Sequence, residues 1–139
     1  MINIRTRSDI ALLVIRLAAG FSFFMHGWQK WQMGIGNVEQ GFSQMGIPMP
    51  GLAAPFIAGL ETLGGIALML GAGTRIFAAL LFCDMFVATM MVHAKNGWLG
   101  QGGMELTALL GAMALGLALA GAGPYSVDGV IGQRGEAKP

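Results

Sequence analysis

The chain has 139 residues, of which 55% are hydrophobic and 11% charged, and its formal net charge is +1. Soluble domains usually carry about 25% charged residues, so this composition predicts an integral membrane protein. The near-neutral charge excludes a nucleic-acid partner, because there is no basic patch to neutralise phosphates. The single cysteine, Cys83, excludes an intrachain disulfide and a cysteine-based metal site.

The first apolar segment, Ile10–Trp28, is long enough to cross a bilayer as a helix. Arg5 and Arg7 precede it, as basic residues precede the apolar region of a cleaved signal peptide. However, Arg16 interrupts the apolar run and no A-x-A-like cleavage site follows it. A membrane span is therefore favoured over a signal peptide.

The connection Gly34–Gly51 is rich in glycine and proline. Within it, Val38, Phe42 and Met45 repeat at i, i+4 and i+7, and polar residues occupy the other faces. This spacing predicts a short amphipathic helix that lies in the outer membrane interface.

Three further apolar segments are predicted to span the membrane: Leu52–Leu70, Ile76–Val92 and Leu106–Ala122. As helices, the four predicted spans reach about 25–28 Å, close to the roughly 30 Å of a hydrocarbon core. The connection Gly71–Thr74 is so short that the second and third spans must be adjacent and antiparallel. We therefore expect an all-α fold, an integral membrane four-helix bundle that forms one transmembrane domain over residues 1–139.

The last predicted span carries a stripe of small residues, each four positions from the next. Such a stripe lets another helix approach closely, either within the bundle or in a homo-oligomer. Both alternatives are open at this point. The stripe consists of Ala108, Ala112, Gly116 and Ala120.

The distribution of basic residues outside the spans predicts the orientation of the chain in the membrane. The side with more lysine and arginine is usually cytoplasmic. Two basic residues, Lys30 and Lys95, lie on one side, and five lie on the other. Both termini are therefore predicted to be cytoplasmic, together with the five residues Arg5, Arg7, Arg75, Arg134 and Lys138.

Arg16, Glu61 and Asp84 each interrupt a predicted span. A charge at membrane depth costs roughly 2.5 kcal/mol or more, so such side chains usually face the protein interior and form pairs. Counting from the predicted boundaries places all three about 10–15 Å deep. We expect an inward-facing cluster in which Arg16 bonds at least one carboxylate. The cluster either fixes the register of the bundle or forms a proton-exchanging or ligand-binding site.

A second group of polar side chains is expected near the outer surface: His26, Lys30, His93 and Glu105. His26 and Lys30 are four residues apart and share one helix face. We regard the four as candidates for binding a quinone headgroup or another small polar ligand. In a regular helix, His93 lies half a turn away from Asp84, so the two point in opposite directions unless the helix end unwinds. The histidine spacing predicts no metal site.

Three blocks of this sequence resemble the DoxX family of four-helix membrane proteins of bacteria and archaea, over about residues 9–131. The blocks are LLVIRLAAGFSFFMHGWQKW, GIPMPGLAAPFIAGLETLGGIALMLGAGTRIFA, and HAKNGWLGQGGMELTALL with GAGPYSVDGVI. The matching positions include Arg16, His26, Lys30, Glu61, His93, Glu105 and Asp128. The resemblance implies a multi-pass bacterial inner (plasma) membrane protein related to a subunit of thiosulfate:quinone oxidoreductase. Other members of the family are linked to membrane-associated redox and thiol homeostasis complexes.

Three functions fit these observations. The favoured one is an inner-membrane subunit that assists a quinone-linked or thiol/sulfur redox complex, without intrinsic cofactor and with quinone as a ligand. Its partners would be the lipid bilayer and a redox protein. The alternatives are a small proton-coupled transporter and a purely structural assembly factor. Arg16 beside Glu61 would repel a cationic substrate, which disfavours the transporter.

Overall fold

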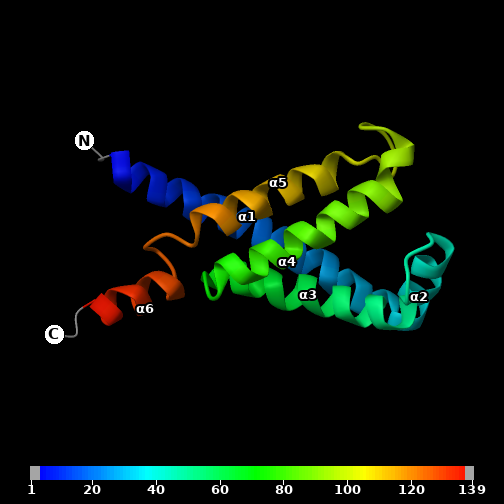
Figure 1. Cartoon of the computed structure of the whole chain (residues 1–139), viewed down its shortest axis with the longest axis horizontal. Coiled ribbons are helices and arrows are strands. Elements are labelled where there is room, and N and C mark those ends of the chain that lie inside the picture. Colours follow the sequence, from blue (N-terminus) through cyan, green and yellow to red (C-terminus); the bar gives the residue numbers. More distant parts are fainter. Residues whose placement is uncertain (1–3, 137–139) are drawn as a thin grey trace.

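A computed structural model describes residues 4–136 as a set of helices, without strands in that range (Figure 1). Three segments are long and apolar enough to cross a membrane: most of α1 (Ile4–Met33), all of α3 (Pro50–Leu70), and Thr74–Asn96. A further apolar helix, α5 (Glu105–Ala120), has 16 residues.

The segment Thr74–Asn96 changes its helical form along its length. It begins as α4 (Thr74–Val87), continues as the π-helical turn η1 (Ala88–His93) and ends as the 3-10 turn η2 (Ala94–Asn96). A π turn is usually an isolated insertion in an α-helix and often occurs at a functional site. Here the turn alters the direction of the side chains that follow it.

Helices α1 and α3 are antiparallel and pack closely enough for their backbones to touch (Figure 1). A Cβ atom on Gly65 would lie 2.5 Å from the backbone nitrogen of Phe24, and one on Gly27 would lie 2.5 Å from that of Thr62. Only glycine fits where helices approach so closely. These contacts fix the register of the two helices.

Helix α4 packs against α5, and the two helix pairs share one apolar core. The core includes Phe23, Leu68, Leu81 and Leu117, all fully or almost fully buried. In Figure 1, α3 and α4 lie close together at the turn that joins them and separate toward the opposite end of the molecule. We call the end at the α3–α4 turn the compact end and the end toward which α3 and α4 separate the open end.

The predicted amphipathic helix is present as α2 (Ile35–Gln44). It packs mainly against α3, and Val38 is buried there with 5% of its surface exposed. The helix lies at the open end of the bundle, together with the segment that joins η2 to α5 (Figure 1).

The small-residue stripe of α5 does not pack inside the bundle. The buried residues of α5 are Leu110, Gly111, Ala114 and Leu117, on a different face of the helix. Of the stripe, Ala112, Gly116 and Ala120 are exposed and Ala108 is partly exposed. Packing within this chain is therefore excluded for most of the stripe.

The described chain ends in a helix that the sequence analysis did not anticipate, α6 (Val127–Glu136). The start of α1 and the end of α6 lie at the same end of the bundle (Figure 1). Lys138, one of the basic residues used to predict orientation, lies outside the described residues.

Asp128 joins α6 to the turn between α3 and α4. Its Oδ1 accepts a hydrogen bond from Gly73 N at 2.8 Å, and its Oδ2 accepts one from Thr74 N at 2.9 Å. Partial burial opposes ionisation of this carboxyl. The hydrogen bonds from Thr74 and Gly73 and the charge of Arg16 outweigh that effect, so the pKa of Asp128 lies below its usual value. The carboxylate thus caps the free N–H groups at the start of α4.

The glycine contact between α1 and α3 can be tested by adding a single methyl group. Gly65→Ala should lower the free energy of unfolding by about 1–3 kcal/mol, because the added Cβ overlaps the α1 backbone. Gly59→Ala in the same helix is the control. Its Cβ would meet nothing within 4 Å, so the change should be neutral or stabilising by up to about 1 kcal/mol. Thermal unfolding in one detergent, followed by circular dichroism, measures both; equal effects would contradict the close approach.

The Asp128 cap predicts a specific pH dependence of stability. Because its pKa is lower in the folded state than the usual value of about 3.9, the carboxylate stabilises the fold above that pH. The contribution is lost as the pH falls through the folded-state pKa. Asp128→Asn should therefore cost about 1 kcal/mol at pH 7 and progressively less below about pH 4. The melting temperatures of the wild type and the variant, measured across pH, report this difference. Glu39→Gln, at an exposed position, is the control. A difference in melting temperature that does not change with pH would contradict the cap.

Candidate functional site

A cavity of about 900 Å³ occupies the open end of the bundle, walled by residues of α1, α3, α4 and α5. Most of its wall is apolar. Phe42 and Met45 of the α2 segment contribute to it, as does Trp98 from the segment before α5. The charged and histidine side chains that line the cavity are His26, Lys30, Glu61, Asp84, His93 and Glu105, and the Thr107 hydroxyl lines it as well. The two groups of polar residues singled out in the sequence therefore meet in one cavity, with the exception of Arg16.

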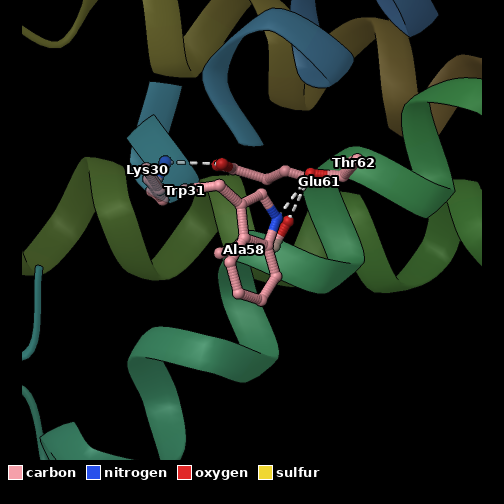
Figure 2. A network of polar contacts seen from close by, with 5 residues as sticks. All are labelled: Lys30, Trp31, Ala58, Glu61 and Thr62. Atoms are coloured by element: carbon pink, nitrogen blue, oxygen red, sulfur yellow. Dashed lines mark hydrogen bonds and ion pairs between the residues drawn. The ribbon is translucent and has the colours of Figure 1, made fainter. Parts of the chain in front are cut away.

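An ion pair between Lys30 and Glu61 crosses the α1–α3 contact. Lys30 Nζ lies 2.5 Å from Glu61 Oε2, and Figure 2 shows the two side chains directed toward each other. The Lys30 side chain is 20% exposed and that of Glu61 is 4% exposed. Beside the pair, Trp31 Nε1 donates a hydrogen bond to Thr62 Oγ1 at 3.1 Å (Figure 2). Two polar contacts thus join α1 and α3, and the Lys30–Glu61 pair is the one that lines the cavity.

The predicted pair of Arg16 and Glu61 does not form, and the three buried charges do not share one depth. The Arg16 guanidinium is 1% exposed and donates hydrogen bonds to the backbone oxygens of Ala122 and, at 2.6 Å, of Tyr125. Positions 16 and 30 are roughly 21 Å apart along a helix. The register therefore brings Arg16 beside Gly71, whose added Cβ would lie 3.0 Å from the guanidinium, and leaves Glu61 to Lys30.

Asp84 is a second carboxyl near the same lysine. Its Oδ2 is buried and has no hydrogen-bond partner among the described residues. The Asp84 side chain is close enough to Glu61 and Lys30 to interact with both charges. Two carboxyl groups thus share one lysine, and in a low dielectric such a site favours binding a proton or a ligand that donates hydrogen bonds.

The π turn η1 places His93 in the cavity with Asp84. A regular α-helix would point the two side chains in opposite directions. The end of this helix is not α-helical, because η1 is a π turn, and both side chains line the same cavity. Thr89, within η1, donates its hydroxyl hydrogen to the Met85 carbonyl at 2.7 Å, a type of bond that often accompanies helix distortion. The buried Thr89 hydroxyl also lies 2.9 Å from that of Thr107 on α5.

A backbone contact selects the tautomer of His93. Its Nδ1 lies 2.7 Å from the carbonyl oxygen of Gly102. A carbonyl oxygen can only accept, so Nδ1 carries the hydrogen. In the neutral imidazole, Nε2 is then a hydrogen-bond acceptor. Asn96 Nδ2 also donates to the Gly102 carbonyl, at 2.8 Å, and holds the same loop.

The remaining candidates, His26 and Glu105, line the cavity without side-chain hydrogen bonds within residues 4–136. The sequence analysis did not include Phe42 and Met45 in the site. Their i, i+4, i+7 pattern was recognised, but the apolar face was assigned to lipid. Only the fold shows that part of this face covers a cavity.

Comparisons of the sequence with known proteins identify its family. The sequence model of the DoxX family matches residues 11–94, more than half of the chain. This chain belongs to the DoxX family. A Bacillus subtilis (strain 168) protein named "Putative oxidoreductase CatD" is 31% identical over 109 residues, covering 78% of this chain and 79% of that protein.

A second relative of this DoxX-family protein is the "Inner membrane protein YqjF" of Escherichia coli (strain K12). It is 28% identical over 128 residues, which cover 91% of this chain and 95% of that protein. No solved structure matches the chain. The family, the relatives and the three long apolar helices confirm the predicted location in the inner membrane.

The Lys30–Glu61 pair of this DoxX-family protein can be tested by a double-mutant cycle. Lys30→Met leaves the more deeply buried carboxylate without its partner and should cost roughly 3 kcal/mol or more of unfolding free energy. Glu61→Met should cost less, because the partly exposed lysine can extend to water. The double variant should recover much of either loss, as measured by detergent melting.

The cycle has a matched control in Arg16→Met combined with Glu61→Met. These two residues do not contact each other, so their losses should simply add. Coupling between Arg16 and Glu61, or additivity of the Lys30 and Glu61 changes, would contradict the observed pairing.

Proposed function

We propose that this DoxX-family protein is a membrane subunit that binds a quinone-type ligand in the cavity and assists a quinone-linked or thiol/sulfur redox partner. The observation that carries this proposal is the cavity itself. Its volume of about 900 Å³ lies within the range of small-molecule sites, about 300–1,000 Å³. A largely apolar wall with a few convergent polar groups is the usual composition of such a site. The name of the Bacillus subtilis relative supports a redox role.

In this proposal the ring of the ligand lies near Lys30, Glu61 and Asp84, and its apolar tail extends toward lipid between α3 and α4. Both helices contribute apolar residues to the cavity wall there, including Phe56 and Leu80. These two side chains are also 60% and 43% exposed, so they lie where a tail would pass from the cavity into the bilayer. The ligand would enter and leave sideways through the membrane.

The same proposal takes α5 as a fourth span and both termini as cytoplasmic. The alignment of the start of α1 with the end of α6 supports an even number of crossings (Figure 1). The excess of basic residues at that end supports its cytoplasmic assignment. The exposed stripe on α5 supports a homo-oligomer contact through Ala112, Gly116 and Ala120.

A small proton-coupled transporter is the second candidate, and one observation favours it. The objection that Arg16 would repel a cationic substrate no longer applies, since Arg16 lies at the other end of the bundle. Asp84 and Glu61 are carboxyls that could exchange a proton for a cation. Lys30 still disfavours a cation at Glu61. A purely structural assembly role does not account for polar groups converging on a cavity.

Ligand binding can be tested with the protein in nanodiscs. Decylubiquinone, a quinone with a short apolar tail, should quench tryptophan fluorescence saturably, because Trp98 lines the cavity. Ala53→Phe, which fills the cavity, should weaken binding at least tenfold. Ala18→Phe adds the same ring at an exposed position of α1 that does not line the cavity, and it should leave binding unchanged. Absence of saturation, or equal binding by both variants, would contradict a quinone site; proton-coupled uptake of a lipophilic cation by proteoliposomes would support the transporter.

A further inference from the structure

The hydrogen-bonding groups of the cavity are unequally divided between donors and acceptors. A quinone ring presents two carbonyl oxygens, which need donors. The reduced ring of a quinol presents two hydroxyl groups, which can donate to acceptors. The groups that the protein leaves without partners therefore indicate which of the two forms the cavity fits.

The principal donor of the cavity is already engaged. Lys30 Nζ lies 2.5 Å from Glu61 Oε2, and this pair joins α1 to α3. A ligand carbonyl that drew the ammonium group away would leave the carboxylate of Glu61, with only 4% of its side chain exposed, without its counter-charge. The ammonium group has three hydrogens, so Lys30 can serve a ligand carbonyl only with a hydrogen that the ion pair does not use, and only while it stays beside Glu61.

Asp84 supplies an acceptor that has no partner. Its Oδ2 is buried without a hydrogen bond from residues 4–136, and its side chain lines the cavity beside the Lys30–Glu61 pair. A buried acceptor without a donor is unfavourable, so a ligand that brings an O–H group to Asp84 gains more than one that brings a second acceptor. While the Asp84 carboxyl is ionised, a carbonyl oxygen at this place would face another acceptor.

His93 supplies a second acceptor. The Gly102 carbonyl takes the Nδ1 hydrogen, which leaves Nε2 of the neutral ring with a free lone pair. Glu105, at the same cavity, adds a carboxylate without a side-chain partner in the described chain. His26 and Thr107 also line the cavity and can serve either role, whereas the indole N–H of Trp98 can only donate. The acceptors come from α4, η1 and α5, whereas the engaged donor comes from α1.

We propose that the cavity binds the reduced, dihydroxylated form of its ligand, a quinol with an apolar tail, in preference to the quinone. Asp84 accepts a hydrogen bond from one ring hydroxyl. The acceptors near η1 and α5, His93 and Glu105, accept a hydrogen bond from the other hydroxyl. This inference rests on the proposed function, and it adds the redox form that the site selects. A tenfold preference for the quinol raises the potential of the bound two-electron couple by about 30 mV.

The test compares three ligands with the same tail in nanodiscs under anaerobic conditions: decylubiquinol, decylubiquinone and the dimethyl ether of the quinol. The ether keeps the reduced ring and its shape but has no O–H donors. We expect the quinol to bind at least tenfold more tightly than the quinone, and the ether to lose that advantage. This comparison uses the unaltered protein, so it does not depend on a variant that folds.

A single substitution then tests the role of Asp84. Asp84→Asn replaces a carboxyl with a carboxamide that can donate, so the preference for quinol should fall at least fivefold and quinone binding should improve. Glu39→Gln makes the same chemical change at an exposed position that does not line the cavity, and it should leave both affinities unchanged.

The outcomes separate this inference from the function on which it rests. Equal affinities, tighter binding of the quinone, or an ether that binds as well as the quinol would overturn the quinol preference and leave a quinone-type site in place. Saturable binding of none of the three ligands would overturn both. An unchanged preference in Asp84→Asn would overturn the assignment of the acceptor to Asp84.

Discussion

The contact between the backbones of α1 and α3 determines where the buried charges of this protein meet. Gly27 and Gly65 leave no space for a Cβ, so the helices cannot shift past each other without a steric clash. In this antiparallel register, residues near the end of α1 face the middle of α3, and residues near the middle of α1 face the end of α3. Glu61 is therefore reached by Lys30, whereas Arg16 is left beside Gly71. The partner of each charge is a consequence of packing between small residues.

The two ends of the bundle use their charges differently. At the compact end, Arg16 binds the backbone oxygens of Ala122 and Tyr125 and lies near the Asp128 carboxylate, which caps α4. There the cation ties the C-terminal segment to α1, and the anion ties α6 to the turn between α3 and α4. At the open end, two carboxyls share Lys30, and one of them has a buried oxygen without a partner. An unmatched acid next to a cavity is a feature of ligand-binding and proton-exchange sites more than of structural ones.

Much of the fold could be predicted from the sequence because apolar length and periodicity determine helices directly. The apolar runs and the i, i+4, i+7 pattern of α2 led to helices that the structure contains. The partner of Glu61 could not be predicted in this way. The depth of the first buried charge was counted from Asp9, the residue before the first predicted span, whereas α1 begins at Ile4. In addition, no local sequence pattern reports the register between two helices. Helix α6 was missed because its three glycines and its polar residues show no clear apolar face.

The residues of the site could be predicted from the sequence better than their arrangement in space. The reason is the π turn η1. Of the six charged and histidine residues that line the cavity, five occupy helices or helix ends in which a regular periodicity describes the direction of the side chain. His93 does not, because the π turn changes the rotation of the chain between Asp84 and His93. In the sequence, Thr89 is the residue that could have indicated the π turn. Its buried hydroxyl donates a hydrogen bond to the carbonyl of Met85, four residues earlier, where the helix changes from α to π. A π turn that moves a histidine toward a cavity is consistent with the tendency of such turns to occur at functional sites. The irregular segment, not the regular helices, completes the set of acceptors that gives this cavity its chemical character.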